Sequence, residues 1–150
     1  FFLFLAIFTF FYNTSPVQAI GVTPGTTSIA NATNGVPITK TIRVTRPETN
    51  GSLNFRVDAY GPGSRYITLP TKTLTIPPGR NYAEYQFIIA PTNTPNGTFQ
   101  AFIQFVSQEP AGTPNMKSSA FSVATYEGAT AEVFFTVTDH EVKEYTIINV

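Results

Sequence analysis

The sequence predicts an all-β fold, an immunoglobulin-like antiparallel β-sandwich of about seven to eight strands. Apolar and polar residues alternate in several successive segments, and turn-forming combinations of Gly, Pro and Asn separate these segments. No segment has a convincing helical period. Aromatic residues make up 14% of the 150 residues, and the chain has 12 prolines and 10 glycines. This composition favours a domain rich in strands and turns over a disordered chain.

The alternating segments define the expected strands. Every second residue is apolar in Leu53–Ala59, Ala83–Ile89, Phe99–Phe105 and Ala131–Val137, so we expect these rows to face the core. Strands are therefore expected near Ile20–Thr23, Val36–Thr45, Leu53–Tyr60, Ile67–Leu69, Thr73–Ile76, Tyr82–Ala90, Thr98–Gln108, Ala120–Tyr126 and Ala131–Thr138.

The segments between the strands carry the turn signals. Glycine tolerates positive φ and proline fixes φ, so each combination of these residues predicts a turn. In the segment Val36–Thr45, Val36 is expected in the inward row and Lys40 interrupts that row. Each buried Phe, Ile, Leu or Val contributes about 1.5–3 kcal/mol before the entropy loss is counted, so the core needs no disulfide. Turns are expected at Asn34-Gly35, Asn50-Gly51, Gly61-Pro62-Gly63, Pro77-Pro78-Gly79, Asn96-Gly97 and Glu127-Gly128.

Residues 1–19 are expected to be a secretory signal peptide. Phe1–Tyr12 is an almost unbroken apolar run, too short for a membrane-spanning helix, which needs roughly 20 residues. Val17 and Ala19 supply the small side chains that signal peptidase requires. The alternative is a buried strand or helix of the folded domain, but 6 of the 14 phenylalanines lie in this run. Cleavage after Ala19 would leave residues 20–138 as one sandwich domain and residues 139–150 as a linker or the start of a following segment.

We expect the chain to be a fragment at both ends. No initiator Met or basic segment precedes Phe1, and the sequence stops within an apolar, strand-like stretch, Tyr145–Val150. A membrane anchor or further domains could lie beyond Val150, and membrane contact is expected only through such an anchor. The expected location is extracellular or at the cell surface.

Charge and the scarcity of reactive residues exclude several function classes. The nine basic and nine acidic side chains balance, so the chain lacks the positive field of a general nucleic-acid binder. The absence of cysteine excludes disulfides, thiol nucleophiles and cysteine-ligated metals. A single histidine excludes sites with several histidine ligands.

No catalytic residue, cofactor site or metal site is expected. His140 lies in Asp139–Glu144, which contains part of a zinc-protease pattern but lacks its second histidine, so a solvated linker is favoured over a weak metal site. A serine hydrolase would need a nucleophile, a histidine and an acid, and no Gly-x-Ser-x-Gly elbow occurs. A glycosidase would need two facing carboxylates, whereas Asp58 and Glu84 lie on separate predicted strands. The sequence therefore predicts a protein that is not an enzyme.

The uneven distribution of charge is the first indication of a ligand. Residues 20–90 contain seven basic and three acidic side chains, and the following residues contain two basic and six acidic ones. Arg43 and Arg56 are expected to point outward from neighbouring strands, and one hypothesis is that they form a basic face that attracts an anionic wall polymer or an acidic protein surface. The favoured interpretation is an ordinary scatter of charges that protects sheet edges from aggregation.

Aromatic residues at outward positions are the second indication. Exposed aromatic rows stack on sugars or anchor protein interfaces, whereas the favoured interpretation is that a loop or a neighbouring domain covers these residues. The residues at such positions or near turns are Tyr60, Tyr66, Tyr82, Phe102 and Phe134. The candidate ligand-contacting surface consists of Arg43, Arg56, Tyr60, Tyr82 and Phe102.

Part of the sequence resembles a known family. Leu74–Arg80 contains an apolar segment and a Pro-Pro-Gly corner, the strand Tyr82–Ala90 follows, and Pro91–Phe99 leads into a strand that includes Phe105. This order resembles bacterial cell-surface immunoglobulin-like modules, most closely the peptidoglycan-binding domain of WxL-type cell-wall proteins, over roughly residues 20–105. The resemblance implies an exported β-sandwich at the cell wall, and it assigns no binding residue.

We therefore expect an exported, non-catalytic module that binds or spaces at the cell envelope, with peptidoglycan as the ligand that the resemblance implies. One alternative is a structural or adhesive immunoglobulin-like unit that binds a protein partner, through strand addition at an exposed edge. Another is an accessory domain of a secreted carbohydrate-active enzyme. The expected partner is thus a cell-wall polymer or another surface protein, without a cofactor or nucleic acid.

Overall fold

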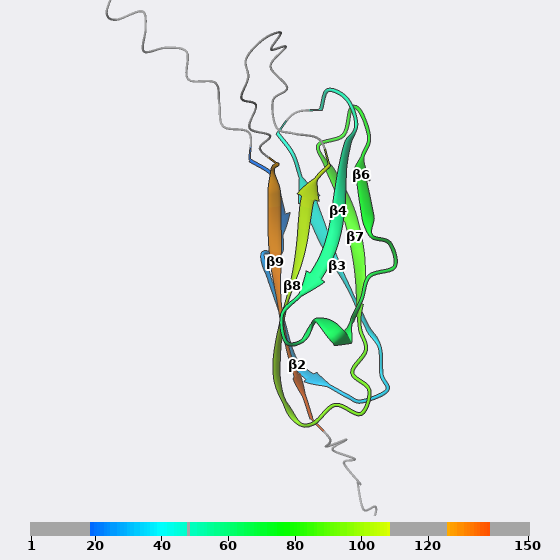
Figure 1. The fold of residues 1–150 in the computed structure, drawn as a ribbon, viewed down its shortest axis with the longest axis vertical. Coiled ribbons are helices and arrows are strands. Elements are labelled where there is room, and N and C mark those ends of the chain that lie inside the picture. Colours follow the sequence, from blue (N-terminus) through cyan, green and yellow to red (C-terminus); the bar gives the residue numbers. More distant parts are fainter. Residues whose placement is uncertain (1–18, 48, 109–125, 139–150) are drawn as a thin grey trace, which may run out of the picture.

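The computed structural model describes residues 19–47, 49–108 and 126–138, and these residues form an all-β sandwich. Within these ranges nine strands are arranged in two sheets that pack face to face, and the 3-10 helix η2 (Ser64–Tyr66) lies between β4 (Leu53–Tyr60) and β5 (Ile67–Thr68) (Figure 1). The predicted immunoglobulin-like sandwich is therefore confirmed. In this part of the chain no helix has the length and apolar character needed to cross a membrane.

One sheet has four strands in the order β1-β3-β7-β5, and all neighbours in it are antiparallel. β3 and β7 pair along their whole length, from Ile38 opposite Ile89 to Thr45 opposite Tyr82. The bounds of the strands are β1 (Gly21–Thr23), β3 (Ile38–Thr45), β5 (Ile67–Thr68) and β7 (Tyr82–Ile89).

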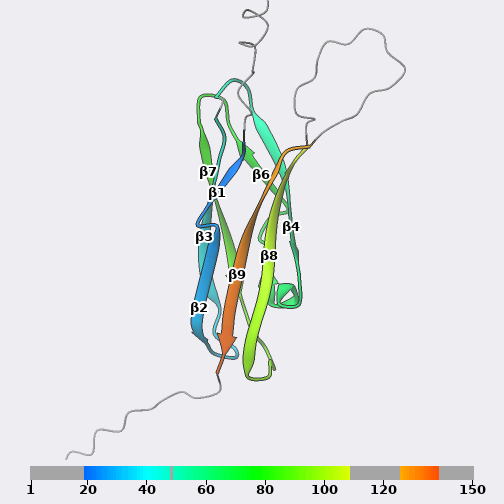
Figure 2. The same ribbon diagram turned by 90° about the vertical axis from the view of Figure 1, so that its left-hand side faces the viewer.

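The other sheet has five strands in the order β2-β9-β8-β4-β6. β2 pairs with β9 in parallel, and the other pairs are antiparallel. The chain passes from one sheet to the other between β1 and β2, so β2 lies beside β9 at the edge of this sheet (Figure 2). The bounds of the strands are β2 (Thr26–Ala32), β4 (Leu53–Tyr60), β6 (Thr73–Ile76), β8 (Gly97–Ser107) and β9 (Gly128–Val137).

The inward rows predicted from the alternation form the core between the sheets. Phe55, Phe87, Phe105 and Phe135 come from β4, β7, β8 and β9, and all four side chains are fully buried. The ring of Tyr85 lies edge-on to that of Phe105, with 5.5 Å between the centroids. Each buried side chain of this size stabilises the fold by about 1.5–3 kcal/mol, which explains a stable sandwich without a disulfide.

Arg46 joins the loops at one end of the sandwich. It directly follows β3, and it is only 8% exposed. Its guanidinium donates hydrogen bonds to the carbonyl oxygens of Gly51 at 2.7 Å, Pro77 at 3.0 Å and Arg80 at 3.0 Å. One buried cation therefore holds both the loop between β3 and β4 and the turn between β6 and β7, two connections that run between the sheets.

Two details of the structure differ from the sequence prediction, and one predicted strand lies almost entirely outside the described residues. β2 (Thr26–Ala32) was not predicted, because small and polar residues give it no continuous apolar row. Val36 was expected in the core but is 52% exposed, because β3 begins only at Ile38. The strand predicted at Ala120–Tyr126 falls almost entirely outside the described residues and stays a prediction.

Candidate functional site

The outer face of the five-stranded sheet brings aromatic and polar side chains together. Tyr60 on β4 lies opposite Phe102 on β8, and Phe102 lies opposite Glu132 on β9. The next outward pair along β8 and β9 is Gln100 and Phe134. Directly opposed and diagonal neighbours on one sheet face lie within reach of each other. We call this surface the aromatic face, defined by Tyr60, Gln100, Phe102, Glu132 and Phe134.

Tyr60 is the most accessible residue of the aromatic face and belongs to a stacked ring pair. Tyr60 is 46% exposed, although it belongs to a regular strand. Its ring stacks on that of Phe102, with 5.1 Å between the centroids and 18° between the planes. Phe102 and Phe134 are half-buried. A ring supported from one side and open on the other can accept the apolar face of a sugar or another flat group.

The turn after β4 fixes the position of the ring pair. Gly61 has φ +96°, a conformation that favours glycine. A Cβ atom at Gly61 would lie 3.2 Å from Cδ2 of Phe102 and 3.3 Å from the carbonyl oxygen of Gln100. The backbone N–H of Gly63 donates to that same carbonyl oxygen at 2.7 Å. The turn therefore closes tightly against β8 and supports the edge of the aromatic face.

Two polar pairs flank the rings. Nε2 of Gln100 donates to Oε1 of Glu132 at 2.5 Å, and Nε of Arg56 donates to Oδ2 of Asp58 at 2.7 Å. Carboxylate oxygens accept hydrogen bonds and guanidinium N–H groups donate them, so both kinds of partner are available to hydroxyl groups of a ligand. With Arg56 positive and both Asp58 and Glu132 negative, these residues give the surface one net negative charge.

A hollow lies further along the same sheet, near the start of β4. It has a volume of about 480 Å³ and is lined by Arg56, Val106, Ser107, Gln108 and Tyr126. Val106 lies opposite Arg56 in the register of β8 and β4, and Tyr126 is 57% exposed. An aromatic ring and a cation therefore border this hollow, which continues the surface beyond the ring pair.

The outer face of the four-stranded sheet uses the same residue types differently. Nη2 of Arg43 donates to Oε1 of Glu84 at 2.9 Å, and the guanidinium carbon lies 4.5 Å from the ring centroid of Tyr82. The hydrogen bond with Glu84 raises the pKa of Arg43 above its usual value, against the opposing effect of desolvation. The guanidinium of Arg43 thus stays protonated and covers one side of the Tyr82 ring. The carboxylate of Glu84 balances its charge.

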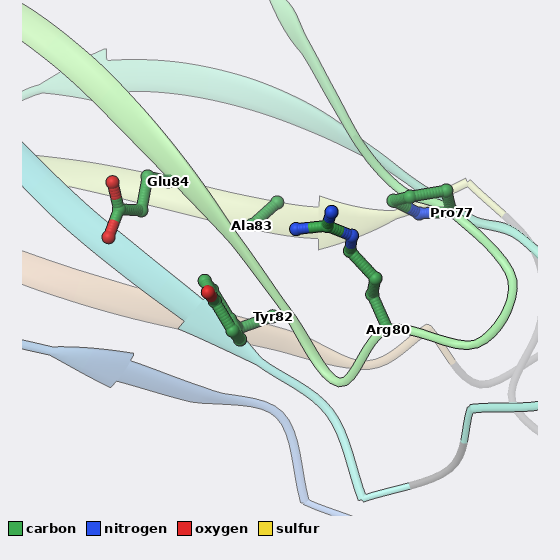
Figure 3. Close-up of a pocket in the computed structure, with 5 residues that line it drawn as sticks. All are labelled: Pro77, Arg80, Tyr82, Ala83 and Glu84. Atoms are coloured by element: carbon green, nitrogen blue, oxygen red, sulfur yellow. The ribbon is translucent and has the colours of Figure 1, made fainter.

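A second hollow of about 480 Å³ lies beside the turn between β6 and β7 (Figure 3). Its lining residues do not converge on one point. Figure 3 shows Arg80, Ala83 and Pro77 on one side of the β7 ribbon and Tyr82 and Glu84 on the other. A small-molecule site requires polar groups that meet around a common centre, and this hollow lacks that arrangement.

The candidate catalytic and metal-ligating residues are not assembled in the described part of the chain. Among these residues no group of three or more His, Cys, Asp or Glu side chains could hold a metal ion. His140 and its neighbours in Asp139–Glu144 lie outside the described ranges. Asp58 on β4 and Glu84 on β7 belong to different sheets, so they do not form the facing pair that a glycosidase needs.

The structure divides the five predicted surface residues between two faces. Arg56, Tyr60 and Phe102 belong to the five-stranded sheet, whereas Arg43 and Tyr82 belong to the four-stranded sheet. The predicted basic face is therefore wrong. β3 and β4 are consecutive in sequence but lie in different sheets, and each of the two arginines is paired with a carboxylate. The contact of these residues with a ligand stays a prediction.

Tyr66 does not belong to an outward row, because it is partly buried against the core. Its ring packs edge-on against Phe99 and Phe135, with centroid distances of 5.2 and 5.9 Å. Gln100 and Glu132 were not among the predicted surface residues, although their hydrogen bond belongs to the aromatic face. The sequence could have indicated them, because both are polar residues at outward positions of β8 and β9, close to Phe102 and Phe134.

Neither protein-family models nor curated proteins match this sequence. Solved structures match in fold. The ASH/PapD-like domain 7 of human CEP192 has a TM-score of 0.59 at 7% identity, and the match covers 81% of this chain and 87% of that chain. The Salmonella enterica SafA pilin–SafB chaperone complex has a TM-score of 0.55 at 9% identity, with coverage of 82% and 56%. A putative carbohydrate binding protein from Bacteroides ovatus has a TM-score of 0.55 at 11% identity, with coverage of 79% and 36%.

These similarities define the class of protein as an immunoglobulin-like β-sandwich and show the fold alone. The identities are 7–11%, and this chain spans little more than half of the chaperone–pilin chain and about a third of the B. ovatus chain. The particular closeness to the peptidoglycan-binding domain of WxL-type proteins stays a prediction.

Proposed function

We propose that this chain is an exported, non-catalytic cell-surface module that binds a polysaccharide of the cell envelope through the aromatic face. The observation that carries the proposal is the Tyr60–Phe102 ring pair, which is stacked, held against a rigid sheet and open to solvent on one side. A pyranose ring presents an apolar patch of C–H groups that stacks on such an aromatic surface.

The polar groups beside the rings fit the hydroxyl groups of a sugar. Glu132 and Asp58 supply acceptor oxygens, and Arg56 and Gln100 supply donors. All of them project from paired strands, which position side chains more rigidly than loops do. A surface of this kind suits an extended polymer better than an isolated small molecule, because the rings lie on the outer face of a sheet.

The charge of the surface favours an uncharged glycan over an anionic polymer. The basic face that would have attracted an anionic wall polymer does not form, and the acids outnumber Arg56 near the rings. The glycan strands of peptidoglycan carry hydroxyl and acetamido groups and are the first ligand to test, as the resemblance of the sequence suggests. The fold similarity to a putative carbohydrate binding protein is compatible with this proposal but does not carry it.

Sedimentation of the purified protein with insoluble peptidoglycan, and separately with cellulose and chitin, tests the proposal. Tyr60→Ala is expected to weaken binding about tenfold, which corresponds to a loss of roughly 1.4 kcal/mol. Tyr82→Ala is the matched control, because it removes a tyrosine from the outer face of the other sheet. Equal binding by wild type and Tyr60→Ala, or a loss confined to Tyr82→Ala, would contradict the aromatic face as the binding surface.

A further inference from the structure

Three Asn-Gly pairs occur in the sequence, at Asn34-Gly35, Asn50-Gly51 and Asn96-Gly97. In such a pair the backbone nitrogen of the glycine can attack the side-chain amide of the asparagine, because glycine has no Cβ atom that hinders the approach. A hydrogen bond that holds either group opposes the reaction, since it must break before the two groups can meet. The hydrogen-bond partners of each pair therefore indicate which asparagine reacts.

The pair Asn34-Gly35 is held by the loop between β7 and β8. Nδ2 of Asn34 donates to the carbonyl oxygen of Thr94 at 2.9 Å, and Oδ1 of Asn34 accepts from the N–H of Thr94 at 3.0 Å. The N–H of Gly35 donates to the carbonyl oxygen of Pro91 at 2.9 Å. Both the amide and the attacking nitrogen of this pair are therefore held in place.

The pair Asn96-Gly97 is held by the sheet. Gly97 is the first residue of β8 and lies opposite Val137 on β9. In the same register, the N–H of Ser107 donates to the carbonyl oxygen of Glu127 at 2.7 Å. Hydrogen-bonded positions alternate along an antiparallel ladder, so Gly97, an even number of residues from Ser107, also directs its N–H to the opposite strand. The attacking nitrogen of this pair therefore belongs to the ladder.

The pair Asn50-Gly51 has neither kind of restraint. It lies in the loop between β3 and β4, and both of its residues are exposed. Within the described part of the chain, the side chain of Asn50 and the N–H of Gly51 have no hydrogen-bond partner. Gly51 has φ +77° and Gly35 has φ +80°, so the conformation of the glycine does not distinguish these two pairs. The difference between them is in their hydrogen-bond partners.

We infer that Asn50 is a site of spontaneous deamidation and that the folded sandwich protects Asn34 and Asn96. The backbone nitrogen of Gly51 forms a bond to Cγ of Asn50, and Nδ2 leaves as ammonia with the proton of the Gly51 N–H. The product is a cyclic succinimide. Water then opens the ring at one of its two carbonyl carbons. Aspartate results where the bond from Cγ to the nitrogen breaks, and isoaspartate results where the bond from the backbone carbonyl carbon breaks.

The isoaspartate product changes the contact between this loop and Arg46. Nη2 of Arg46 donates to the carbonyl oxygen of Gly51 at 2.7 Å and to that of Thr49 at 3.4 Å. Isoaspartate adds a methylene group to the main chain directly before Gly51, so the Gly51 carbonyl oxygen shifts relative to Arg46. Aspartate keeps the length of the main chain and adds a carboxylate between two residues that bind a cation. Isoaspartate is therefore expected to weaken this end of the sandwich, and aspartate is not. The inference does not depend on the proposed binding of a polysaccharide.

Incubation of the purified protein at mildly alkaline pH, followed by peptide mapping with mass spectrometry, tests the inference. In the folded protein, Asn50 is expected to deamidate at least about tenfold faster than Asn34 or Asn96, because each protected pair must first open. The same incubation in urea is the matched control. Unfolding removes the hydrogen bonds of both protected pairs, so the three asparagines are then expected to react at similar rates. Equal rates at the three positions in the folded protein would overturn the inference. So would a folded protein in which Asn50 does not react while the unfolded protein does.

A comparison with Asn50→Asp tests the effect on Arg46. The variant carries the new charge without the longer main chain, so it is expected to unfold at the same urea concentration as the fresh wild type. The deamidated fraction of the wild type, isolated by ion exchange and shown by peptide mapping to contain isoaspartate, is expected to unfold at a lower urea concentration. Incubated Asn50→Ala lacks the reacting amide and is expected to keep its initial stability. If the isoaspartate fraction unfolds as Asn50→Asp does, the contact between Gly51 and Arg46 is not sensitive to this modification, and that part of the inference is wrong.

Discussion

The two outer faces of the sandwich contain similar residues but differ in what those residues leave open. On the four-stranded sheet, Arg43 covers the ring of Tyr82 and binds Glu84. On the five-stranded sheet, Tyr60 rests on Phe102 and keeps its other side exposed, while Arg56 binds Asp58 instead of covering a ring. A tyrosine at an outward position is therefore not enough for a binding surface. The neighbour that occupies or supports its ring decides whether a ligand can reach it.

The largest expected effect is that of Arg46, which links the two sheets. Its loss should destabilise the whole sandwich and not one face in particular. Arg46→Met keeps much of the side-chain volume but leaves the carbonyl oxygens of Gly51, Pro77 and Arg80 without their donor. We expect the free energy of unfolding to fall by about 3 kcal/mol, measured by urea denaturation. Arg80→Met is the control, since the described residues give the side chain of Arg80 no hydrogen-bond partner, and it should change stability by less than about 0.5 kcal/mol. Equal effects of the two substitutions would contradict this role of Arg46.

The next effect concerns Gly61, whose substitution should disturb the aromatic face and leave the outer face of the other sheet unchanged. Gly61→Ala places a methyl group at φ +96° and 3.2 Å from Cδ2 of Phe102, so it should lower the free energy of unfolding by about 2 kcal/mol. Gly79→Ala is the matched control, since Gly79 has φ +78° but open space around it, and about 1 kcal/mol is expected. Binding to the polysaccharide that the wild type binds, measured by sedimentation, should weaken for Gly61→Ala but not for Gly79→Ala. Unchanged binding by both would show that the position of Phe102 is not critical.

The comparison of the faces also shows where reasoning from the sequence succeeds. The inward rows of β4, β7, β8 and β9 were predicted correctly, because burial of one side of a strand imposes a period of two on the sequence. β2 has no such row, since its residues are small and polar and its place is determined by parallel pairing with β9. A strand defined mainly by its backbone partner leaves little signal in its side chains.

The candidate site could be predicted only in part for a related reason. The outward positions of Tyr60 and Phe102 follow from the alternation within each strand. Which strands share a sheet does not follow from it. Arg43 and Arg56 lie on consecutive strands and looked like neighbours, but the chain changes sheet between β3 and β4. The stacking of Tyr60 on Phe102 depends on the pairing of β4 with β8, two strands far apart in the sequence.

A smaller effect on stability is expected for Tyr85, which lies in the core between the two sheets. Burial raises the pKa of Tyr85 above 10.0, and its hydroxyl donates a hydrogen bond to the carbonyl oxygen of Thr71. Tyr85→Phe should lower the free energy of unfolding by about 1 kcal/mol near neutral pH. Because the unfolded tyrosine loses its proton first, the wild type should lose stability as the pH rises above 10.0, and its advantage over Tyr85→Phe should shrink. Denaturation curves on both sides of this pH measure the difference. An advantage that stays constant or grows with pH would contradict a raised pKa.

The last expected effect is of similar size and measures the ring pair itself. A double-mutant cycle of Tyr60→Ala and Phe102→Ala should give a coupling energy of about 0.5–1.5 kcal/mol in the free energy of unfolding, because the two rings stack directly. The matched cycle combines Tyr60→Ala with Tyr82→Ala, whose residues lie on opposite sheets, and its effects should add without coupling. If both cycles are additive, Tyr60 is not supported by Phe102, and its exposure reflects a loose side chain. A ring without a fixed support must be ordered by the ligand, so the aromatic face would then lose the preorganisation on which its binding depends.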